Sequence, residues 1–109
     1  MERFSEWNAL PAEPLEGLER RIFHGEKAML VRNHIQPHAV LPLHSHPHEQ
    51  LIYVEAGQCE LTLDGETRLL TAGGLAWVPS GAEHGVVNPG EETLVALDIF
   101  APIREDFLK

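Results

Sequence analysis

The most informative absences in this chain of 109 residues concern cysteine, long apolar runs and basic charge. Cys59 is the single cysteine, so no disulfide can form within the chain, and we interpret it as a small buried apolar side chain. No run of about 18 apolar residues occurs, which argues against a membrane-spanning helix. The first residues also lack the apolar core and cleavage pattern of a signal peptide, so we expect a cytoplasmic protein.

Basic residues are the other shortage: eight Lys and Arg stand against seventeen Asp and Glu, for a net charge of −9. Nucleic-acid binding needs a basic face, so this balance argues against such a partner. It also constrains an anionic substrate, because the overall field repels it and a local cation must supply the attraction. The length, with no linker or internal repeat, predicts one domain over residues 1–109.

What the chain does contain is a series of short strand-like segments punctuated by Gly, Pro, Asn and Asp. They lie at residues 27–35, 50–55, 60–63, 67–70, 75–78, 86–87 and 93–101. Many short strands of this kind predict an all-β sandwich or barrel, with Asp64-Gly65 as a hairpin turn. Residues 15–21 fit either a helical turn or the start of a strand. Pro102 is suited to open a short C-terminal helix through Phe107, which we expect to pack across one end of the barrel.

The strongest functional signal is the segment His44-Ser45-His46-Pro47-His48-Glu49-Gln50, together with the distant His84. In extended backbone His44 and His46 project from the same face about 6.6 Å apart. Two imidazoles at that separation can lean onto one metal ion with bonds of about 2.0–2.1 Å. Such a local pair needs a distant ligand to complete the site, and His84 is the candidate.

These residues resemble the two motifs of the cupin superfamily. In the first, G-x5-H-x-H-x3,4-E-x6-G, the pair is His44 and His46, Gln50 occupies the acidic position and His38 stands where the first glycine is expected. The second, G-x5-P-x-G-x2-H-x3-N, is matched throughout by Gly73, Pro79, Gly81, His84 and Asn88. The resemblance implies a double-stranded β-helix, a small jelly-roll barrel whose mouth forms a pocket for a small molecule.

The resemblance also implies a ligand set of His44, His46, Gln50 and His84 for one divalent transition metal ion. Glu49 is the competitor for the fourth position, although strand alternation aims it at the opposite face unless Pro47 shifts the register. We place His48 at the rim or behind the ligands. Imidazole-rich sites accept Zn, Ni, Cu, Fe or Mn, so the identity of the ion stays open. A neutral Gln50 would leave the full double charge on it.

A second cluster lies in the last strand-like segment. Residues 93–101 are apolar on both faces, and Asp98 interrupts them. A carboxylate there needs a partner or a function, because burying an unpaired charge is costly. One interpretation is a salt bridge to Arg104 or a backbone hydrogen bond. The other is a pocket acid or base, with Arg104 as an anion clamp and Phe100 as a pocket wall rather than simple core.

The histidine-rich segment and the tail Asp98-Ile99-Phe100-Ala101-Pro102-Ile103-Arg104 together are similar to the KdgF-type cupins of uronate catabolism. That family converts 4,5-unsaturated monouronates, released by pectin or alginate lyases, into linear keto sugars. The resemblance implies catalytic roles for Asp98, Phe100 and Arg104 and an anionic sugar as substrate. Another metallo-cupin activity (dioxygenase, decarboxylase or sugar isomerase) and a non-enzymatic binding module remain as alternatives. We also expect a homodimer, because small cupins pair their edge strands or sheets.

Overall fold

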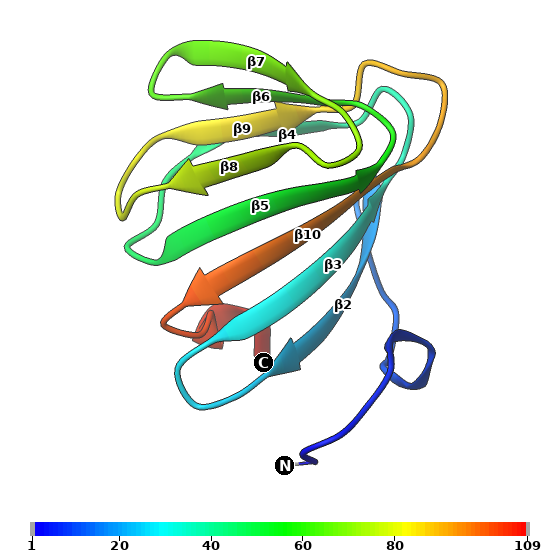
Figure 1. Ribbon diagram of the computed structural model, residues 1–109, viewed down its shortest axis with the longest axis vertical. Helices are drawn as coiled ribbons and strands as arrows, with labels where there is room; N and C mark the ends of the chain where they lie inside the picture. Colours follow the sequence, from blue (N-terminus) through cyan, green and yellow to red (C-terminus); the bar gives the residue numbers. More distant parts are fainter. Residues whose placement is uncertain (1, 109) are drawn as a thin grey trace.

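The computed structural model describes residues 2–108, and its regular secondary structure consists almost entirely of antiparallel β-strands (Figure 1). The chain runs through η1 (Trp7–Ala9), β1 (Glu13–Leu15), β2 (Leu18–His24), β3 (Met29–Ile35), β4 (Val40–His44), β5 (Glu49–Ala56), β6 (Cys59–Leu63), β7 (Glu66–Leu70), β8 (Leu75–Val78), β9 (His84–Val87), β10 (Leu94–Ala101) and η2 (Glu105–Leu108). No helix among the described residues has the length and apolar character needed to cross a membrane.

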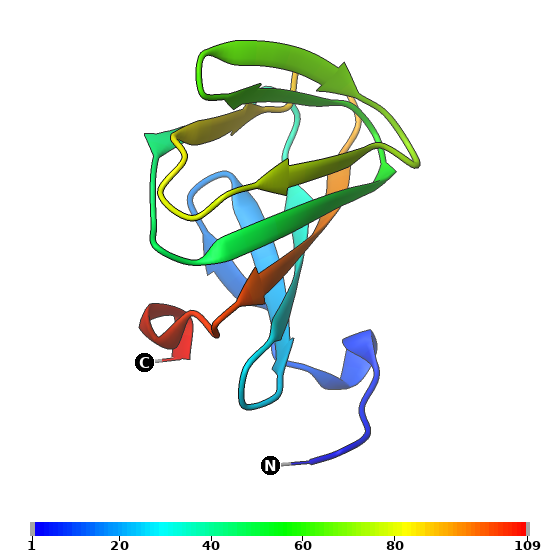
Figure 2. The ribbon, with the colours of Figure 1, turned by 60° about the vertical axis from the view of Figure 1, so that its left-hand side comes forward.

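The strands form two sheets that curve toward each other, as Figures 1 and 2 show, and two clusters of buried apolar residues lie inside. The larger sheet has the order β1-β2-β3-β10-β5-β8, and the smaller has the order β4-β9-β6-β7. The predicted all-β jelly-roll barrel is confirmed. The β6–β7 turn is also as predicted, because Asp64 and Gly65 both adopt positive φ, at 47° and 83°, as a tight two-residue hairpin requires.

Two details differ from the sequence-based expectations, and one open alternative is decided. The undecided segment 15–21 is a hairpin, in which Leu15 ends β1, residues 16–17 form the turn and residues 18–21 begin β2. β4 was not predicted at all, because Pro42 and the polar residues after it hide the pattern of a strand. The C-terminal stub is a single 3-10 turn over Glu105–Leu108, rather than a helix that begins at Pro102.

The core lies between the two sheets and is built by strand alternation. In β3, Met29, Val31, Asn33 and Ile35 are buried, while the alternate residues Leu30, Arg32 and His34 are partly exposed. Cys59 is 1% exposed and belongs to this core, as the sequence predicted. Burial raises the pKa of its thiol to about 11, so it is a packing residue.

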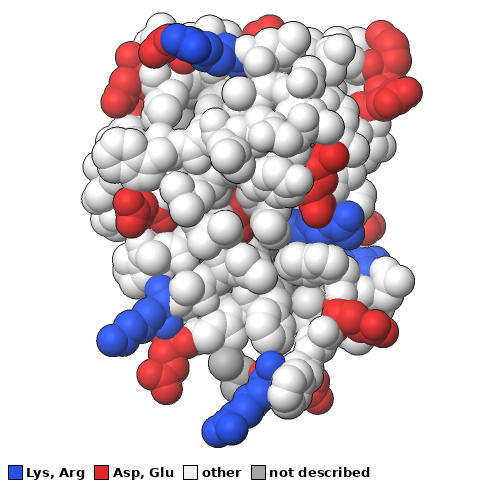
Figure 3. Space-filling model, in the orientation of Figure 1, with Lys and Arg blue, Asp and Glu red and all other residues white. Residues whose placement is uncertain are grey.

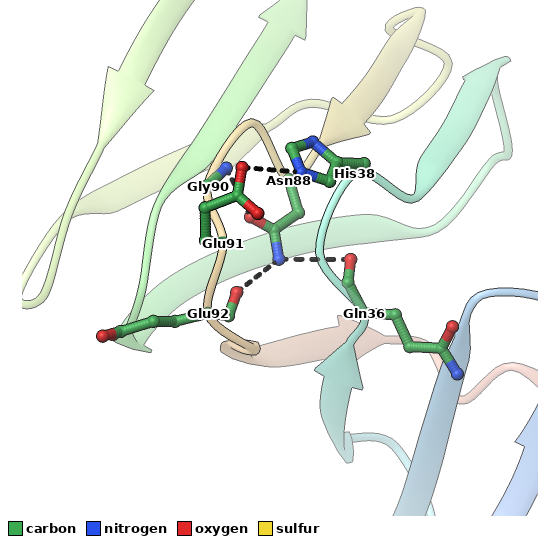
Figure 4. Close-up of polar contacts among 6 residues, drawn as sticks. All are labelled: Gln36, His38, Asn88, Gly90, Glu91 and Glu92. Atoms are coloured by element: carbon green, nitrogen blue, oxygen red, sulfur yellow. Dashed lines mark hydrogen bonds and ion pairs between the residues drawn. The ribbon is translucent and has the colours of Figure 1, made fainter.

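Asn88 closes the barrel at one end of β9, directly after the last residue of the strand (Figure 4). Its Nδ2 group donates to three carbonyl oxygens, those of Ile35, Gln36 and Glu92, at 2.9–3.2 Å, and its Oδ1 accepts from the Gly90 backbone N–H at 3.0 Å. The same end holds His38, which adopts a φ of 66° at the position where the first motif has glycine. Histidine therefore makes this left-handed turn in place of glycine.

Candidate metal centre

The other end of β9 begins with His84, and strand pairing brings it to His44. His44 is the last residue of β4, and it pairs directly with His84 across the smaller sheet. His46 follows in the loop between β4 and β5. The ring centroids of His44 and His84 are 4.3 Å apart, and those of His46 and His84 are 4.8 Å apart. The candidate ligand atoms of the three histidines all lie within 4.8 Å of one another.

Each of the three rings is oriented by a backbone carbonyl. The Nδ1 atoms lie 2.9–3.0 Å from the carbonyl oxygens of Pro42, His48 and Ala82, for His44, His46 and His84 respectively. A carbonyl oxygen can only accept, so each Nδ1 carries the proton and each Nε2 keeps its lone pair. Metal-binding histidines are commonly fixed in this way, with one ring nitrogen donating to the protein and the other facing the ion.

The electrostatics of the site also fit a cation. Burial lowers the pKa of His84, and burial together with the charge of Arg104 lowers that of His46, so both rings are neutral at neutral pH. The Nε2 atom of His84 is buried and has no hydrogen-bond partner among residues 2–108. A buried polar atom without a partner costs stability, and a bound metal ion would satisfy it.

Gln50 and Glu49 point to opposite faces of β5. Gln50 is 6% exposed, and its Oε1 atom lies 3.1 Å from the Nε2 atom of His46. Glu49 is exposed and accepts a hydrogen bond of 2.8 Å from the Trp77 indole. The geometry therefore favours Gln50 as the fourth ligand. His48 contributes its carbonyl oxygen to the orientation of His46, and its own ring lies 5.5 Å from that ring.

Asp98 faces the same cavity from β10. Burial raises its pKa to about 6, against the lowering effects of a Gln50 contact, an Asn33 hydrogen bond and the Arg104 charge. The Asn33 Nδ2 group donates to Asp98 Oδ2 at 2.8 Å. Within the described part of the chain the ion pair of Arg104 is with Asp106, at 2.9 Å, so the alternative of a direct Asp98–Arg104 salt bridge is not what the structure shows.

Phe100 and Arg104 complete the mouth. The buried ring of Phe100 lies 5.6 Å from the ring of His46, and the Arg104 guanidinium lies 5.1 Å from the Phe100 centroid. These groups border a cavity of about 220 Å³, whose polar lining residues are Arg20, Asn33, His44, Gln50, His84, Asp98 and Arg104. One cavity therefore joins three of the predicted metal ligands, His44, Gln50 and His84, to the predicted reaction residues.

The sequence-based reasoning missed Asn33, Arg20 and Phe107, which also line the cavity. Asn33 is 7% exposed and shares the inward face of β3 with Val31 and Ile35. A polar residue at an inward position of an apolar strand was the signal that could have identified it. Arg20 and Phe107 offered no such signal. The Arg20 guanidinium lies 4.0 Å from the Phe107 ring centroid, and this contact depends on how the C-terminal turn packs against β2, which no local sequence pattern reveals.

Comparison with known proteins gives three main results. The cupin domain family matches residues 31–100. The pectin degradation protein KdgF of Dickeya dadantii (strain 3937) is 36% identical over 111 residues, which cover 99% of this chain and 100% of that protein. Two solved structures are similar. The first is the crystal structure of an RmlC-like cupin from Shewanella frigidimarina NCIMB 400, with 33% identity, a TM-score of 0.92 and coverage of 98% of this chain and 96% of that one. The second is KdgF from Halomonas sp., with 31% identity, a TM-score of 0.89 and coverage of 98% of this chain and 99% of that one.

Proposed function

This chain belongs to the cupin family, and we propose that it is a metal-dependent enzyme that opens the ring of 4,5-unsaturated monouronates to give linear keto sugars. The observation that carries the proposal is the single cavity shared by two groups of residues. One group is His44, His84 and Gln50, which belong with His46 to the candidate metal centre, and the other is Asp98 with Arg104. The full-length similarity to two proteins named KdgF, one of them named for pectin degradation, supports this choice of substrate.

The candidate ligands of the ion are the Nε2 atoms of His44, His46 and His84 and the Oε1 atom of Gln50. When bound, a divalent ion supplies Lewis-acid polarisation of substrate oxygens. Gln50 suits this arrangement because its side chain also contacts the Asp98 carboxylate. A glutamate at position 50 would place a second negative charge beside Asp98 and would reduce the positive charge of the site.

Arg104 would bind the uronate carboxylate. Its guanidinium makes two hydrogen bonds to the half-exposed carboxylate of Asp106, at 2.9 and 3.1 Å, and this two-point geometry supports the proposed role. Asp106 lies only two residues away on an exposed turn and can give way to a substrate group. In a chain of net charge −9, Arg104 and the ion would provide the local attraction that an anionic sugar needs.

Asp98 would move the proton. In the ring opening the hemiacetal C–O bond of the ring breaks, the anomeric hydroxyl loses its proton as the aldehyde forms, and the ring oxygen becomes an enol hydroxyl. The enol hydroxyl then loses that proton to become a ketone, while the other carbon of the enol double bond gains a proton. The net reaction is therefore an isomerisation. A carboxyl group with a pKa of about 6 can accept and return a proton near neutral pH.

The test is to incubate the purified protein with unsaturated galacturonate and follow the ultraviolet band of the conjugated double bond. We expect the band to disappear faster than in a protein-free sample, to persist when a chelator is present and to disappear again when a divalent ion is restored. Asp98→Asn should keep the fold and bind the ion but lose most turnover. A metal-loaded wild-type protein that leaves the band at the protein-free rate would overturn the proposal.

The proposal includes a homodimer formed through the outer face of β5 and β8. Figure 3 shows a broad area without charged side chains over these strands. It contains four exposed large apolar side chains, paired across the two strands: Leu51 with Trp77 and Tyr53 with Leu75. A second copy of the chain can cover this patch with its own uncharged patch, and the acidic groups of the two copies then stay apart. Sedimentation of the wild type and of Leu75→Lys tests it: a dimer that becomes a monomer is expected, and a wild-type monomer would contradict it.

A further inference from the structure

Asp98 lies between two amide side chains, one on each neighbouring strand. β10 runs between β3 and β5 in the larger sheet (Figure 1). From β3, the Asn33 Nδ2 group donates to Asp98 Oδ2 at 2.8 Å. From β5, the side chain of Gln50 approaches the same carboxylate. The carboxylate is therefore held from both sides of its own strand.

The two amides have different surroundings. The Oε1 atom of Gln50 lies 3.1 Å from His46 Nε2, so this amide borders the histidine cluster. Asn33 belongs to β3, where its inward neighbours Val31 and Ile35 are apolar and buried. A buried amide in such a strand costs free energy unless it is hydrogen-bonded. The hydrogen bond to Asp98 is the feature of the structure that accounts for an amide at this position.

We propose that Asn33 is a positioning residue for Asp98. Its N–H group occupies Oδ2 and prevents the carboxylate from rotating, so that Oδ1 is the oxygen that exchanges a proton with the bound substrate. An amide neither gains nor loses a proton at neutral pH, so Asn33 acts only through Asp98. The substrate named in the tests rests on the proposed function, but the hydrogen bond from Asn33 to Asp98 is independent of it.

The first test is kinetic, with Asn33→Leu, which removes the donor and nearly keeps the volume. We expect kcat on unsaturated galacturonate to fall about 10- to 100-fold, as for the loss of one hydrogen bond to a charged group, with KM and metal affinity nearly unchanged. In an Asp98→Asn background the same change should cause no further loss. Val54→Ala, in the fully buried core of β5, is the control for a general loss of stability and should keep kcat.

The second test does not depend on turnover. Crystal structures of the metal-loaded wild type and Asn33→Leu should show the Asp98 carboxylate rotated in the variant, with His44, His46, His84 and Gln50 in place. An unrotated carboxylate would overturn the positioning role whatever the kinetics. So would a rise in KM that accounts for the whole kinetic effect, because Asn33 would then contact the substrate itself. A wild type without turnover would refute the proposed reaction and leave the two crystal structures to decide the role of Asn33.

Discussion

His84 and Asn88 are both almost fully buried, both belong to the second motif, and they lie at opposite ends of β9. Asn88 makes four hydrogen bonds to backbone groups and uses both ends of its amide. His84 uses only Nδ1, and its Nε2 atom has no partner among the described residues. At one end of the strand the buried side chain has hydrogen-bond partners at both ends of its amide, and at the other end the buried side chain has one nitrogen without a partner. A satisfied buried group stabilises the fold, whereas an unsatisfied one lowers stability and is explained by a ligand.

The same contrast separates the surroundings of the two residues. Around Asn88 the partners are backbone carbonyls and an N–H group, which hold the loops together whatever the pH (Figure 4). Around His84 the neighbours are other titratable side chains, and burial shifts the pKa values of His46, His84 and Asp98 in the direction of their neutral forms. One end of the barrel is therefore built for stability and the other for chemistry.

The largest expected effect comes from His84→Leu, which replaces the imidazole and its unsatisfied nitrogen by an apolar side chain of similar size. Loss of one of four ligands should weaken the binding of a divalent ion by about 1000-fold, or about 4 kcal/mol. Stability without metal should change little, because loss of the Nδ1 hydrogen bond to the Ala82 carbonyl is offset by removal of the unsatisfied buried Nε2 atom. Titration calorimetry with Zn²⁺ and Mn²⁺, and urea unfolding in a chelator, measure the two quantities. Unchanged metal affinity would remove the contrast.

Asn88→Ala should give the opposite result. Without the amide, three carbonyl oxygens and one N–H group lose their partner at a buried position, which should lower the free energy of unfolding by about 2–5 kcal/mol. The folded fraction should bind the ion with wild-type affinity, since His84 lies at the other end of the strand. Urea unfolding and metal titration of the same sample test both parts. A variant as stable as the wild type would show that the amide network contributes nothing.

Asp98→Asn tests how the buried carboxyl of Asp98 makes the stability of the metal-free protein depend on pH. The pKa of Asp98 is raised from 3.8 to about 6 by burial, so the folded state favours the protonated carboxyl. That favourable contribution is complete below about pH 4 and is lost as the pH rises through about 6. At pH 8 the free energy of unfolding, measured with urea, should therefore be about 1–3 kcal/mol higher in the variant than in the wild type. At pH 4 the two proteins should be almost equally stable. An equal gain at both pH values would refute this account.

Glu49→Gln is expected to have the smallest effect and decides between two adjacent candidate ligands. Glu49 bonds to the Trp77 indole on the outer face, so the variant should change metal affinity by no more than about twofold. Gln50→Ala is the matched change on the inner face and should weaken metal binding clearly. If Glu49→Gln weakens binding as much as Gln50→Ala does, the fourth position belongs to Glu49.

The sequence predicted the barrel and the histidine cluster because both depend on local patterns. Alternation identified most strands, and the fixed spacing of His44, His46 and His84 within the two motifs identified the candidate ligands. The opposite orientations of Glu49 and Gln50 followed from the same alternation. Long-range pairing then brought His84 to His44, as the motif implied.

What the sequence could not give are the partners that meet only through sheet order. Asn33 and Asp98 are 65 residues apart, and they touch because β3 and β10 are neighbours in the larger sheet. A salt bridge from Asp98 to Arg104 was one of two interpretations, but the turn η2 offers Arg104 the carboxylate of Asp106 two residues away, and this local ion pair forms instead. The contact of Arg20 with Phe107 likewise depends on where the C-terminal turn packs.

The central claim is that the unsatisfied end of β9 holds one divalent ion together with His44, His46 and Gln50. Anomalous diffraction from crystals grown with excess Zn²⁺ or Mn²⁺ tests it most directly. The account predicts a single peak at bonding distance from the three Nε2 atoms and from the Oε1 atom of Gln50. Density without a peak there, with the three imidazoles turned away from one another, would contradict it.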